Sequence, residues 1–479
     1  MDHYTPMIVG ETITAGQREI FAPWDWTPIA TIATSGPDGV EQALSTAHAL
    51  FRDRNAWLPA DERIAILGRT ADLMREEAEP LALEAAREGG KPLTDSRIEV
   101  TRAIDSIRLC AETLRHDAGE GIPMDIDAAS RGKHAFTVAE PIGVVVALSA
   151  FNHPLNLIAH QVGPAVAAGC PVIVKPAQVT PLSCFRLVAL LQRAGLPEAW
   201  CQALLTEDRE TTGTLVSDPR VGFLSFIGGP TVGWKLRSQL APGTRCALEH
   251  GGAAPVIVAE DADLDTALPR LLKGGFYHAG QVCVSVQRIF VHQSRARELA
   301  EGLASRAHAL RIGDPTREDT EVGPLIRPAE VNRVQQWVDE AVSGGAEVLS
   351  GGHPHSDSSY ACTVLYAPPS EAQVSREEIF GPVVCIFPYD DLDEALTRAN
   401  DLPWAFQAAV FSNHLPTIQH VAHRIDASAV MVNEHTAFRV DWMPFAGLRQ
   451  SGLGVGGIPY TYEDMRVRKM VVLDPPDVQ

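Results

Sequence analysis

The sequence has little that would tie the protein to a membrane or to an oxidising compartment. No window approaches the roughly 18 uninterrupted apolar residues that a membrane-spanning helix needs. The first residues, Met1-Asp2-His3-Tyr4-Thr5, lack the basic and then apolar pattern of a signal peptide. The 8 cysteines form no CxxC pair and no disulfide-like spacing. Reduced thiols in a cytoplasmic protein are therefore expected.

Basic residues are scarce relative to acidic ones. The chain has 40 Lys and Arg against 60 Asp and Glu, which gives a formal net charge of −20 spread along its length. A surface this acidic repels nucleic acid and anionic membranes, so neither is an expected partner. It leaves room for a local positive pocket that binds a small anion. No internal repeat is evident, and no metal is expected.

What the sequence does contain indicates an α/β protein of two or three domains. Its 479 residues are too many for one core, and residues 37–120 carry apolar side chains at helical spacing. Residues 131–140 predict one strand of a hairpin. After Pro141, short apolar runs alternate with helical stretches, which predicts parallel sheets with crossover helices. One group of strands is expected at 143–148, 172–174, 202–205, 223–226 and 256–259, and a second, in another domain, at 288–292, 383–387, 408–411 and 429–432.

A cysteine and a glutamate form the most informative pair in the chain. Cys283 lies in the run Gly280-Gln281-Val282-Cys283, and Glu249 precedes it in Leu248-Glu249-His250-Gly251-Gly252. A thiolate can add to an aldehyde, and a carboxylate can then activate the water that removes the acyl group. Taken singly, each residue has a plainer interpretation, a buried cysteine or a solvated glutamate. Together they suggest two-step chemistry on one carbonyl.

Four further segments supply candidate binding groups. Asn152 follows a predicted strand, where its amide could donate to an oxyanion or satisfy a turn. Lys175 closes an apolar strand and suits ribose or phosphate, unless it is a surface lysine. The segment with Gly228, Gly229, Thr231 and Gly233 joins a strand to a helix, where it could approach phosphate or simply form a tight turn. Glu378 and Phe380 could hold ribose and pack beside a nicotinamide, or form a strand edge.

These five ordered motifs resemble the aldehyde dehydrogenase superfamily over nearly the whole chain. The resemblance implies Cys283 as nucleophile, Glu249 as general base and Asn152 as oxyanion donor. It also implies a cofactor site with the residues Lys175, Gln178, Gly228, Gly229, Thr231, Gly233, Glu378 and Phe380. The implied fold is a Rossmann-like cofactor domain (1–121 and 142–250), an α/β catalytic domain (251–453) and a small β oligomerisation element (122–141 and 454–479). A homodimer or homotetramer is expected.

Departures from the family pattern bear on the base and the cofactor. His250 stands where leucine is common beside the glutamate, so it could shift the pKa of Glu249. Gly229 stands where serine is common, which removes a hydroxyl donor for phosphate. Gln178 stands where a glutamate favours NAD by repelling a 2′-phosphate. The cofactor is therefore expected to be NAD or NADP, with NAD weakly favoured.

The substrate residues are suggested by a narrower resemblance. Residues 432–447 and the variant Phe151-Asn152-His153-Pro154 resemble the phosphonoacetaldehyde and lactaldehyde dehydrogenase-like group. His153 would make the substrate wall polar, and Arg439 could bind a carboxylate, phosphonate or hydroxyl on a short aldehyde. Alternatively, Arg439 pairs with Asp441 or Glu434. Val282 stands where some enzymes for phosphorylated aldehydes carry an arginine, which weakens the charged-substrate interpretation.

The function expected from these residues is NAD(P)-dependent oxidation of a short, polar or anionic aldehyde to its carboxylic acid through a cysteine thioester. One alternative is a CoA-acylating relative, in which a thiol takes the acyl group; the presence of Glu249 disfavours it. Another is a catalytically silent protein that reuses the fold. The presence of Cys283, Glu249 and Asn152 together argues against that alternative.

Overall fold

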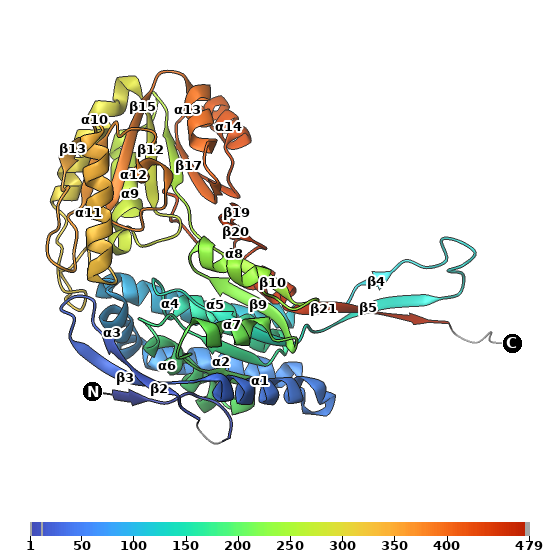
Figure 1. Ribbon diagram of the computed structural model, residues 1–479. Helices are drawn as coiled ribbons and strands as arrows, with labels where there is room; N and C mark the ends of the chain where they lie inside the picture. Colours follow the sequence, from blue (N-terminus) through green and yellow to red (C-terminus); the bar gives the residue numbers. More distant parts are fainter. Residues whose placement is uncertain (1, 11–12, 475–479) are drawn as a thin grey trace.

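The computed structural model of the chain describes residues 2–10 and 13–474. Its two large sheets lie in separate lobes, and a narrow β arm projects from one side (Figure 1). The arrangement confirms the predicted α/β fold class. In the described part of the chain, no helix is both long and apolar enough to cross a membrane.

The first sheet has six strands in the order β20-β10-β9-β6-β7-β8. All neighbours are parallel except β20, which is antiparallel to β10. In sheet order, the strands are Gly452–Leu453, Arg245–Glu249, Val221–Ile227, Val144–Leu148, Val172–Lys175 and Cys201–Ala203. The helices of this lobe are α1 (Pro37–Arg52), α2 (Ala60–Glu76), α3 (Ala78–Gly89), α4 (Leu93–Arg115), α5 (Asn156–Ala168), α6 (Leu182–Arg193), α7 (Arg209–Ser217), α8 (Pro230–Ser238) and α15 (Ile458–Asp464).

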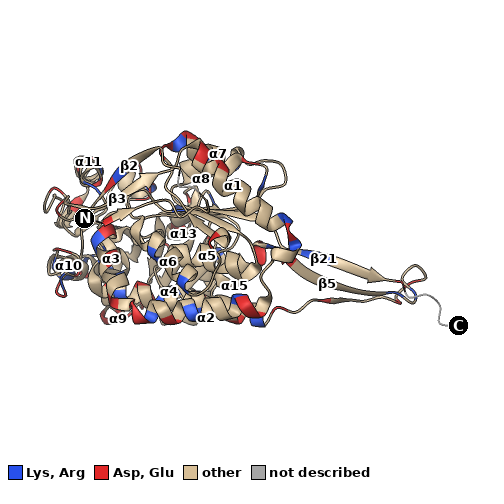
Figure 2. Ribbon diagram, turned by 90° about the horizontal axis from the view of Figure 1, so that it is seen from below, with Lys and Arg blue, Asp and Glu red and all other residues tan. Residues whose placement is uncertain are grey.

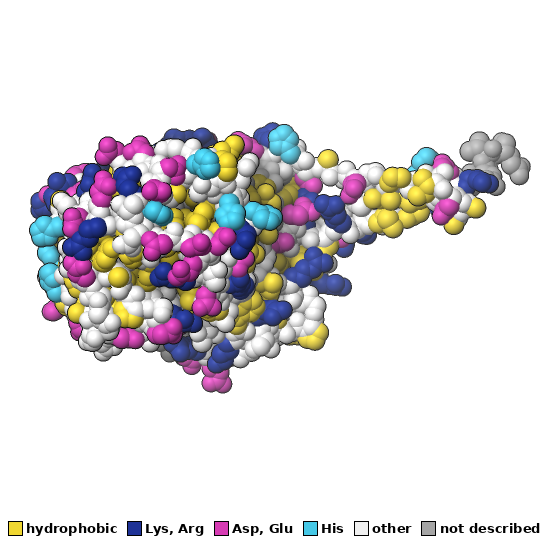
Figure 3. Space-filling view, turned by 90° about the horizontal axis from the view of Figure 1, so that it is seen from above, with side chains coloured by type: hydrophobic (Ala, Val, Ile, Leu, Met, Phe, Trp, Pro, Cys, Tyr) yellow, Lys and Arg dark blue, Asp and Glu magenta, His cyan; other side chains and the backbone are white. Residues whose placement is uncertain are grey.

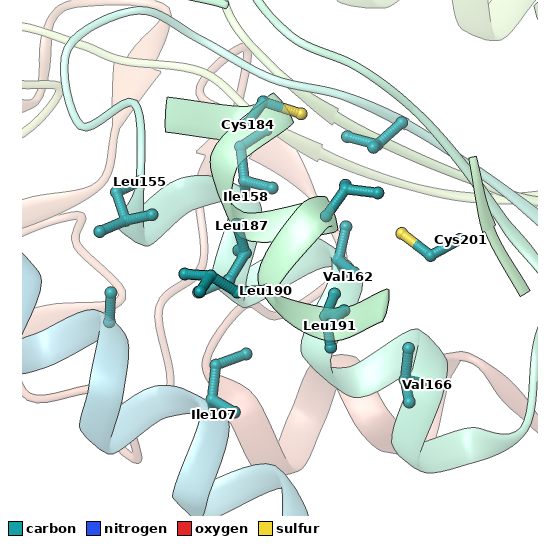
Figure 4. Packing of buried hydrophobic residues seen from close by; sticks show 14 of the residues in the cluster. Ile107, Leu155, Ile158, Val162, Val166, Cys184, Leu187, Leu190, Leu191 and Cys201 are labelled. Carbon is teal, nitrogen blue, oxygen red and sulfur yellow. The ribbon is translucent and has the colours of Figure 1, made fainter. Parts of the chain in front are cut away.

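Alternation along β6 places apolar side chains on both faces of this sheet. Val145 and Ala147 belong to the core under α4, α5 and α6, whereas Val144 and Val146 belong to the core under α1. Figure 4 shows the first of these cores, where side chains of α5 and α6 interdigitate near Ile107 of α4. A strand buried on both faces reads as a continuous apolar run, which is why β6 was predictable.

The second sheet has seven strands in the order β13-β14-β15-β12-β11-β17-β18, with only β13 antiparallel to its neighbour. In sheet order, they are Glu347–Ser350, Thr363–Tyr366, Val383–Tyr389, Val286–His292, Ala254–Val258, Gln407–Phe411 and Ala429–Val432. The helices of this lobe are α9 (Leu264–Phe276), α10 (Gln293–His308), α11 (Pro328–Ser343), α12 (Gln373–Arg376), α13 (Leu392–Asn400) and α14 (Leu415–Arg424).

The structure corrects one strand assignment. Residues 256–259 were expected in the first group, but β11 pairs with β12 and β17 in the second sheet. The strand that the first sheet has instead, β10, escaped prediction because Arg245, Cys246 and Ala247 are partly or fully exposed and give no continuous apolar run. A short N-terminal sheet of β1 (Asp2–Tyr4), β3 (Pro28–Thr34) and β2 (Gly16–Phe21) was also not predicted.

The arm is a three-stranded antiparallel sheet in the order β21-β5-β4. Its strands are β21 (Arg466–Leu473), β5 (His134–Pro141) and β4 (Gly121–Ile122). Apolar side chains gather on its surface (Figure 3), and they include Phe136, Val138, Met470, Val472 and Leu473. Elsewhere, acidic and basic residues are interspersed along the helices (Figure 2). The predicted boundaries of the three domains stay a prediction.

Candidate active site

A cavity of about 440 Å³ gathers residues from both halves of the chain. Several strands of the first sheet end at it, as expected where parallel strands present their carboxyl ends to a ligand. Of the predicted site residues, it is lined by Asn152, His153, Gly228, Gly229, Glu249, Cys283, Glu378, Phe380 and Arg439. Lys175, Gln178, Thr231 and Gly233 belong to neighbouring segments and are not among the residues that line it.

Asn152 lies in the loop between β6 and α5 and reaches the loop that carries the cysteine. It is buried, and its Nδ2 donates to the carbonyl of Gln281, 2.9 Å away. An amide nitrogen has two hydrogens, so one remains for a second acceptor. The bond links the predicted oxyanion donor to the segment of the predicted nucleophile, although the two residues lie far apart in sequence.

Cys283 follows a turn with unusual backbone conformation. His278 and Ala279 both have left-handed φ values, 48° and 54°, although neither is glycine. Such conformations cost free energy and persist only where surrounding contacts hold them. Burial raises the pKa of the Cys283 thiol to about 12, and the positive charge of Arg439 acts in the opposite direction. In the resting protein, the group is therefore a thiol beside a cation that favours its thiolate.

Glu249 is the last residue of β10. Burial raises the pKa of its carboxyl, against an opposing effect from Arg439. A raised pKa brings a carboxylate closer to the range in which a general base works efficiently. The carboxylate lies tightly against the chain at Gly456, where an added Cβ would come within 2.3 Å of Oε1. Gly456 is therefore part of the space that holds the candidate base.

The ring of His250 is held by residues other than Glu249. Its Nδ1 lies 2.9 Å from the carbonyl oxygen of Gln450, and the ring packs edge-on against Phe226 and Trp234. Burial lowers the pKa of His250. The charged neighbour that acts on Glu249 is Arg439 rather than this histidine. The ring also occupies the space above Gly233, where an added Cβ would lie 2.1 Å from Nε2.

The segment at the start of α8 suits a phosphate group. Gly229 is the N-cap of this helix and provides no side-chain cap. Pro230 has no N–H, and Val232 and Gly233 donate to the carbonyl of Gly229, so the N–H of Thr231 is the one in the first turn that is available to an anion. An added Cβ at Gly229 would meet nothing within 4 Å, so the approach is open. At Gly228, by contrast, a Cβ would lie 2.8 Å from the ring of Phe226. The residues present therefore fit a dinucleotide phosphate.

Lys175 and Gln178 lie beside this region, at the end of β7 and in the turn that follows it. Lys175 Nζ donates to the carbonyl of Pro176 at 3.3 Å, and burial lowers its pKa to about 8. Across the cavity, Glu378 Oε1 accepts from the N–H of Gly252 at 3.2 Å. Burial raises the pKa of Glu378 to about 8.

Phe380 has a left-handed φ of 46° and packs edge-on against Phe151, with ring centroids 5.7 Å apart. These aromatic rings form part of the cavity wall. A flat apolar wall of this kind can pack against an aromatic ring of a ligand, which is the role that the sequence suggested for Phe380.

Arg439 does not form either of the ion pairs considered as alternatives. Glu434 pairs with Arg270 at 3.0 Å, and Asp441 pairs with Arg102 at 2.6 Å. The Arg439 guanidinium carbon instead lies 3.6 Å from the centroid of the Phe445 ring, and its Nε is buried without a hydrogen-bond partner. A guanidinium beside a cavity and held by an aromatic face retains donors for an anionic ligand.

Sequence analysis missed two residues on the substrate side of the cavity. Arg102 of α4 lines it and binds Asp441 through Nε and Nη2, at 3.1 and 2.6 Å. Tyr277 lines it too, with its hydroxyl 3.3 Å from Nε2 of His153. Burial holds the pKa of His153 well below its usual value, so it is neutral at pH 7. Nothing local in the sequence marks Arg102, because its partner lies 339 residues away.

Residues 12–471 match the aldehyde dehydrogenase family. A 3-sulfolactaldehyde dehydrogenase from Priestia aryabhattai is 37% identical over 461 residues, which cover 96% of each protein. A lactaldehyde dehydrogenase from Methanocaldococcus jannaschii is 32% identical and is covered over 99% of its length by 97% of this chain. Among solved structures, aldehyde dehydrogenase 21 from Physcomitrella patens in complex with the reaction product succinate superimposes with a TM-score of 0.94, at 33% identity over 98% of both chains.

Proposed function

The chain belongs to the aldehyde dehydrogenase family and is an NAD(P)-dependent aldehyde dehydrogenase, and from that premise we propose that its substrate is a short aldehyde with a carboxylate or sulfonate at the far end. The observation that carries the proposal is the pair of guanidinium groups, Arg102 and Arg439, on the wall of the cavity that contains Cys283. Two guanidiniums offer several donors to one anion. The names of the two relatives and the succinate of the solved neighbour support the same class of short, polar compound.

In the proposed reaction, the Cys283 thiol releases its proton to solvent water, and the resulting thiolate adds to the aldehyde carbon. The free N–H of Asn152 and the backbone N–H of Cys283 donate to the oxyanion that forms. When bound, the dinucleotide supplies the acceptor for the hydride that leaves this carbon. Glu249 then removes a proton from the water that attacks the Cys283 thioester, which releases the carboxylic acid and the thiol.

Hydrolysis is favoured over transfer of the acyl group to coenzyme A. Glu249 lines the same cavity as Cys283, and its pKa is raised by burial, which suits a base for water. A route that ends in transfer to a thiol has less need of such a base.

For the cofactor, we propose a weak preference for NAD. The uncapped N-terminus of α8 would hold the phosphate. Glu378 would hold a ribose, and Phe380 would pack beside the nicotinamide. Gln178 can bond to ribose hydroxyls, but it lacks the negative charge that would exclude a 2′-phosphate. NADP should therefore also be accepted.

We also propose that the arm joins copies of this chain. Phe136, Val138, Met470, Val472 and Leu473 are each between 38% and 56% exposed, an unusual concentration of apolar surface on a projecting element. Burying such a surface against a second copy would stabilise a dimer or tetramer. Light scattering of the purified protein distinguishes these assemblies from a monomer.

Arg439→Ala tests the substrate proposal. The KM for succinate semialdehyde should rise about 30-fold, or about 2 kcal/mol, because a charged hydrogen-bond partner is lost. The KM for butanal, a neutral aldehyde with the same number of carbons, should rise far less. Steady-state rates of cofactor reduction, read near 340 nm, measure both.

Arg333→Ala is a matched control, because Arg333 also lines the cavity but is bound to the carbonyl of Ile379 and to Glu330. It should not change the preference between the two aldehydes. Equal effects of Arg439→Ala on both substrates, or a wild-type preference for long aliphatic aldehydes, would contradict the proposed substrate class while leaving the aldehyde dehydrogenase activity in place.

A further inference from the structure

A buried histidine outside the predicted site lies between the two charged groups that shape the substrate side. His160 is in the first half of α5 and is 4% exposed. Its Nε2 lies 2.7 Å from Oδ1 of Asp441, and its Nδ1 lies 3.4 Å from Nη2 of Arg439. Each ring nitrogen therefore contacts a different charged residue from the C-terminal part of the chain.

The chemistry of these partners allows only one arrangement of protons on the neutral ring. A carboxylate accepts hydrogen bonds, so Nε2 must carry the hydrogen that is donated to Asp441. A guanidinium only donates, so Nδ1 must present its lone pair to Arg439. Burial lowers the pKa of His160 to about 4, so the ring is neutral near pH 7. The carboxylate thus fixes the tautomer that can accept from Arg439.

Asp441 is itself firmly held. It is 5% exposed and accepts from Nε and Nη2 of Arg102 and from Nδ2 of Asn156, in addition to His160. Paired carboxylates in a buried network strongly resist movement, because breaking one contact leaves a charge uncompensated. Asp441 therefore provides a fixed point from which both cavity arginines are oriented, Arg102 directly and Arg439 through His160.

Arg439 has few other restraints. Its guanidinium packs on the face of Phe445, which restricts it to a plane but leaves rotation within that plane open. Its Nε has no hydrogen-bond partner. Of the contacts that the structure gives this side chain, the bond to His160 is therefore the directional one.

We propose that His160 is a positioning residue that directs Arg439 at the anionic end of the aldehyde and thereby sets the preference for anionic over neutral substrates. The inference rests on the proposed function, because it assumes that Arg439 receives the anion. It adds a relay, Asp441 to His160 to Arg439, in which a residue that does not touch the substrate determines how well the substrate is recognised.

Three variants test this relay. His160→Leu fills a similar volume but removes both ring contacts. His160→Asn keeps an oxygen acceptor near the position of Nδ1. Gln161→Leu, at the next position of α5, is the matched control. The Gln161 side chain is also buried, and it donates to Leu148 and Ser225 and not to a partner of Arg102 or Arg439.

For each variant, kcat and KM are measured for succinate semialdehyde and for butanal, together with the unfolding midpoint. His160→Leu should lower the ratio of kcat/KM for the anionic over the neutral aldehyde about tenfold, mainly through KM, which corresponds to about 1.4 kcal/mol. His160→Asn should restore part of the ratio, because it keeps an acceptor for Arg439 but loses the bond to Asp441. Gln161→Leu should lower the unfolding midpoint without changing the ratio.

An equal loss for both aldehydes in His160→Leu, or an unchanged ratio, would overturn the relay. Failure of His160→Asn to restore any of the ratio would also overturn it, because the acceptor for Arg439 would then be irrelevant. Arg439→Ala separates this failure from that of the proposed function. If Arg439→Ala discriminates between the aldehydes and His160→Leu does not, the relay alone is wrong; if neither discriminates, the substrate proposal is wrong too.

Discussion

The two sides of the cavity present different kinds of chemical group to a ligand. On the side of β9 and α8, the candidate contacts are backbone N–H groups and glycines, such as Gly228 and Gly229, with aromatic rings behind them. On the opposite side, the wall includes the charged side chains of Arg102 and Arg439, and Asp441 holds them from behind, Arg102 directly and Arg439 through His160. Backbone geometry changes little when side chains change, so the first side suits a cofactor common to a family. The second can be altered by single substitutions, and it suits selection among substrates.

Removing the nucleophile, Cys283, should have the largest effect and should show whether the cofactor side binds its ligand independently of the reaction. Cys283→Ala should reduce oxidation of every aldehyde by at least about 10⁴-fold, as expected when a nucleophile is lost. Binding of NAD, followed by quenching of tryptophan fluorescence, should change by less than about threefold. Substantial turnover by this variant would remove Cys283 from its assigned role. Lost NAD binding would instead show that the two sides are not independent.

Glu249→Gln should slow steady-state turnover by about 10²- to 10³-fold, within the usual contribution of a general base. A burst of reduced cofactor close to one equivalent should remain, because the amide cannot activate water for the second step. Mass spectrometry of the stalled protein should find the acyl group on Cys283. If the burst disappears as well, Glu249 acts in the first step, on the thiol.

The same residue sets the expected pH dependence. Burial raises the pKa of Glu249, so in the wild type the hydrolysis rate should increase as pH rises through a value above the usual 4.5 of a glutamate. In Glu249→Gln this limb should be absent from single-turnover measurements of thioester hydrolysis. An identical limb in the variant would assign the titration to another group.

Gln178→Glu should have the smallest effect and should act on the cofactor side alone. A carboxylate near the ribose would repel a 2′-phosphate, and the ratio of kcat/KM for NAD over NADP should rise about tenfold, or about 1.4 kcal/mol. The ratio between anionic and neutral aldehydes should not move. A wild-type preference already above about a thousandfold would show that a residue other than Gln178 selects the cofactor.

The same contrast explains what the sequence could reveal. Asn152 and Gly228 follow predicted strands of the first sheet, so strand order alone brings their loops to one edge, and local patterns marked these positions. Glu249 ends β10, which was not predicted, and was marked by its pairing with Cys283. Cys283 belongs to a separate lobe, and only the resemblance to a family placed it opposite Glu249.

Arg102 and His160 had no such signal, and Asp441 was named only as a possible partner of Arg439. Each lies in a segment with an ordinary helical or loop pattern, and their contacts span 281 and 339 residues of sequence. A charged residue in a helix is usually exposed, so nothing indicated that Arg102 reaches the cavity wall. Prediction of β10 failed for a related reason. Most of its side chains are partly or fully exposed, so the strand has no continuous apolar run that would mark it in the sequence.

The close fit between Gly456 and Glu249 has a consequence for the stage of synthesis at which the active site can form. β10 belongs to a sheet whose other parallel strands precede it in the chain. Arg439, Phe445 and Gly456 follow it by about 190 to 210 residues and close around the carboxylate and the thiol. Domains fold progressively as a chain leaves the ribosome. Until the segment that carries these residues emerges, Cys283 has no cation beside it and Glu249 has no enclosing wall. The environment of the reactive thiol is thus completed only after residue 456 has been synthesised, well after Cys283 itself.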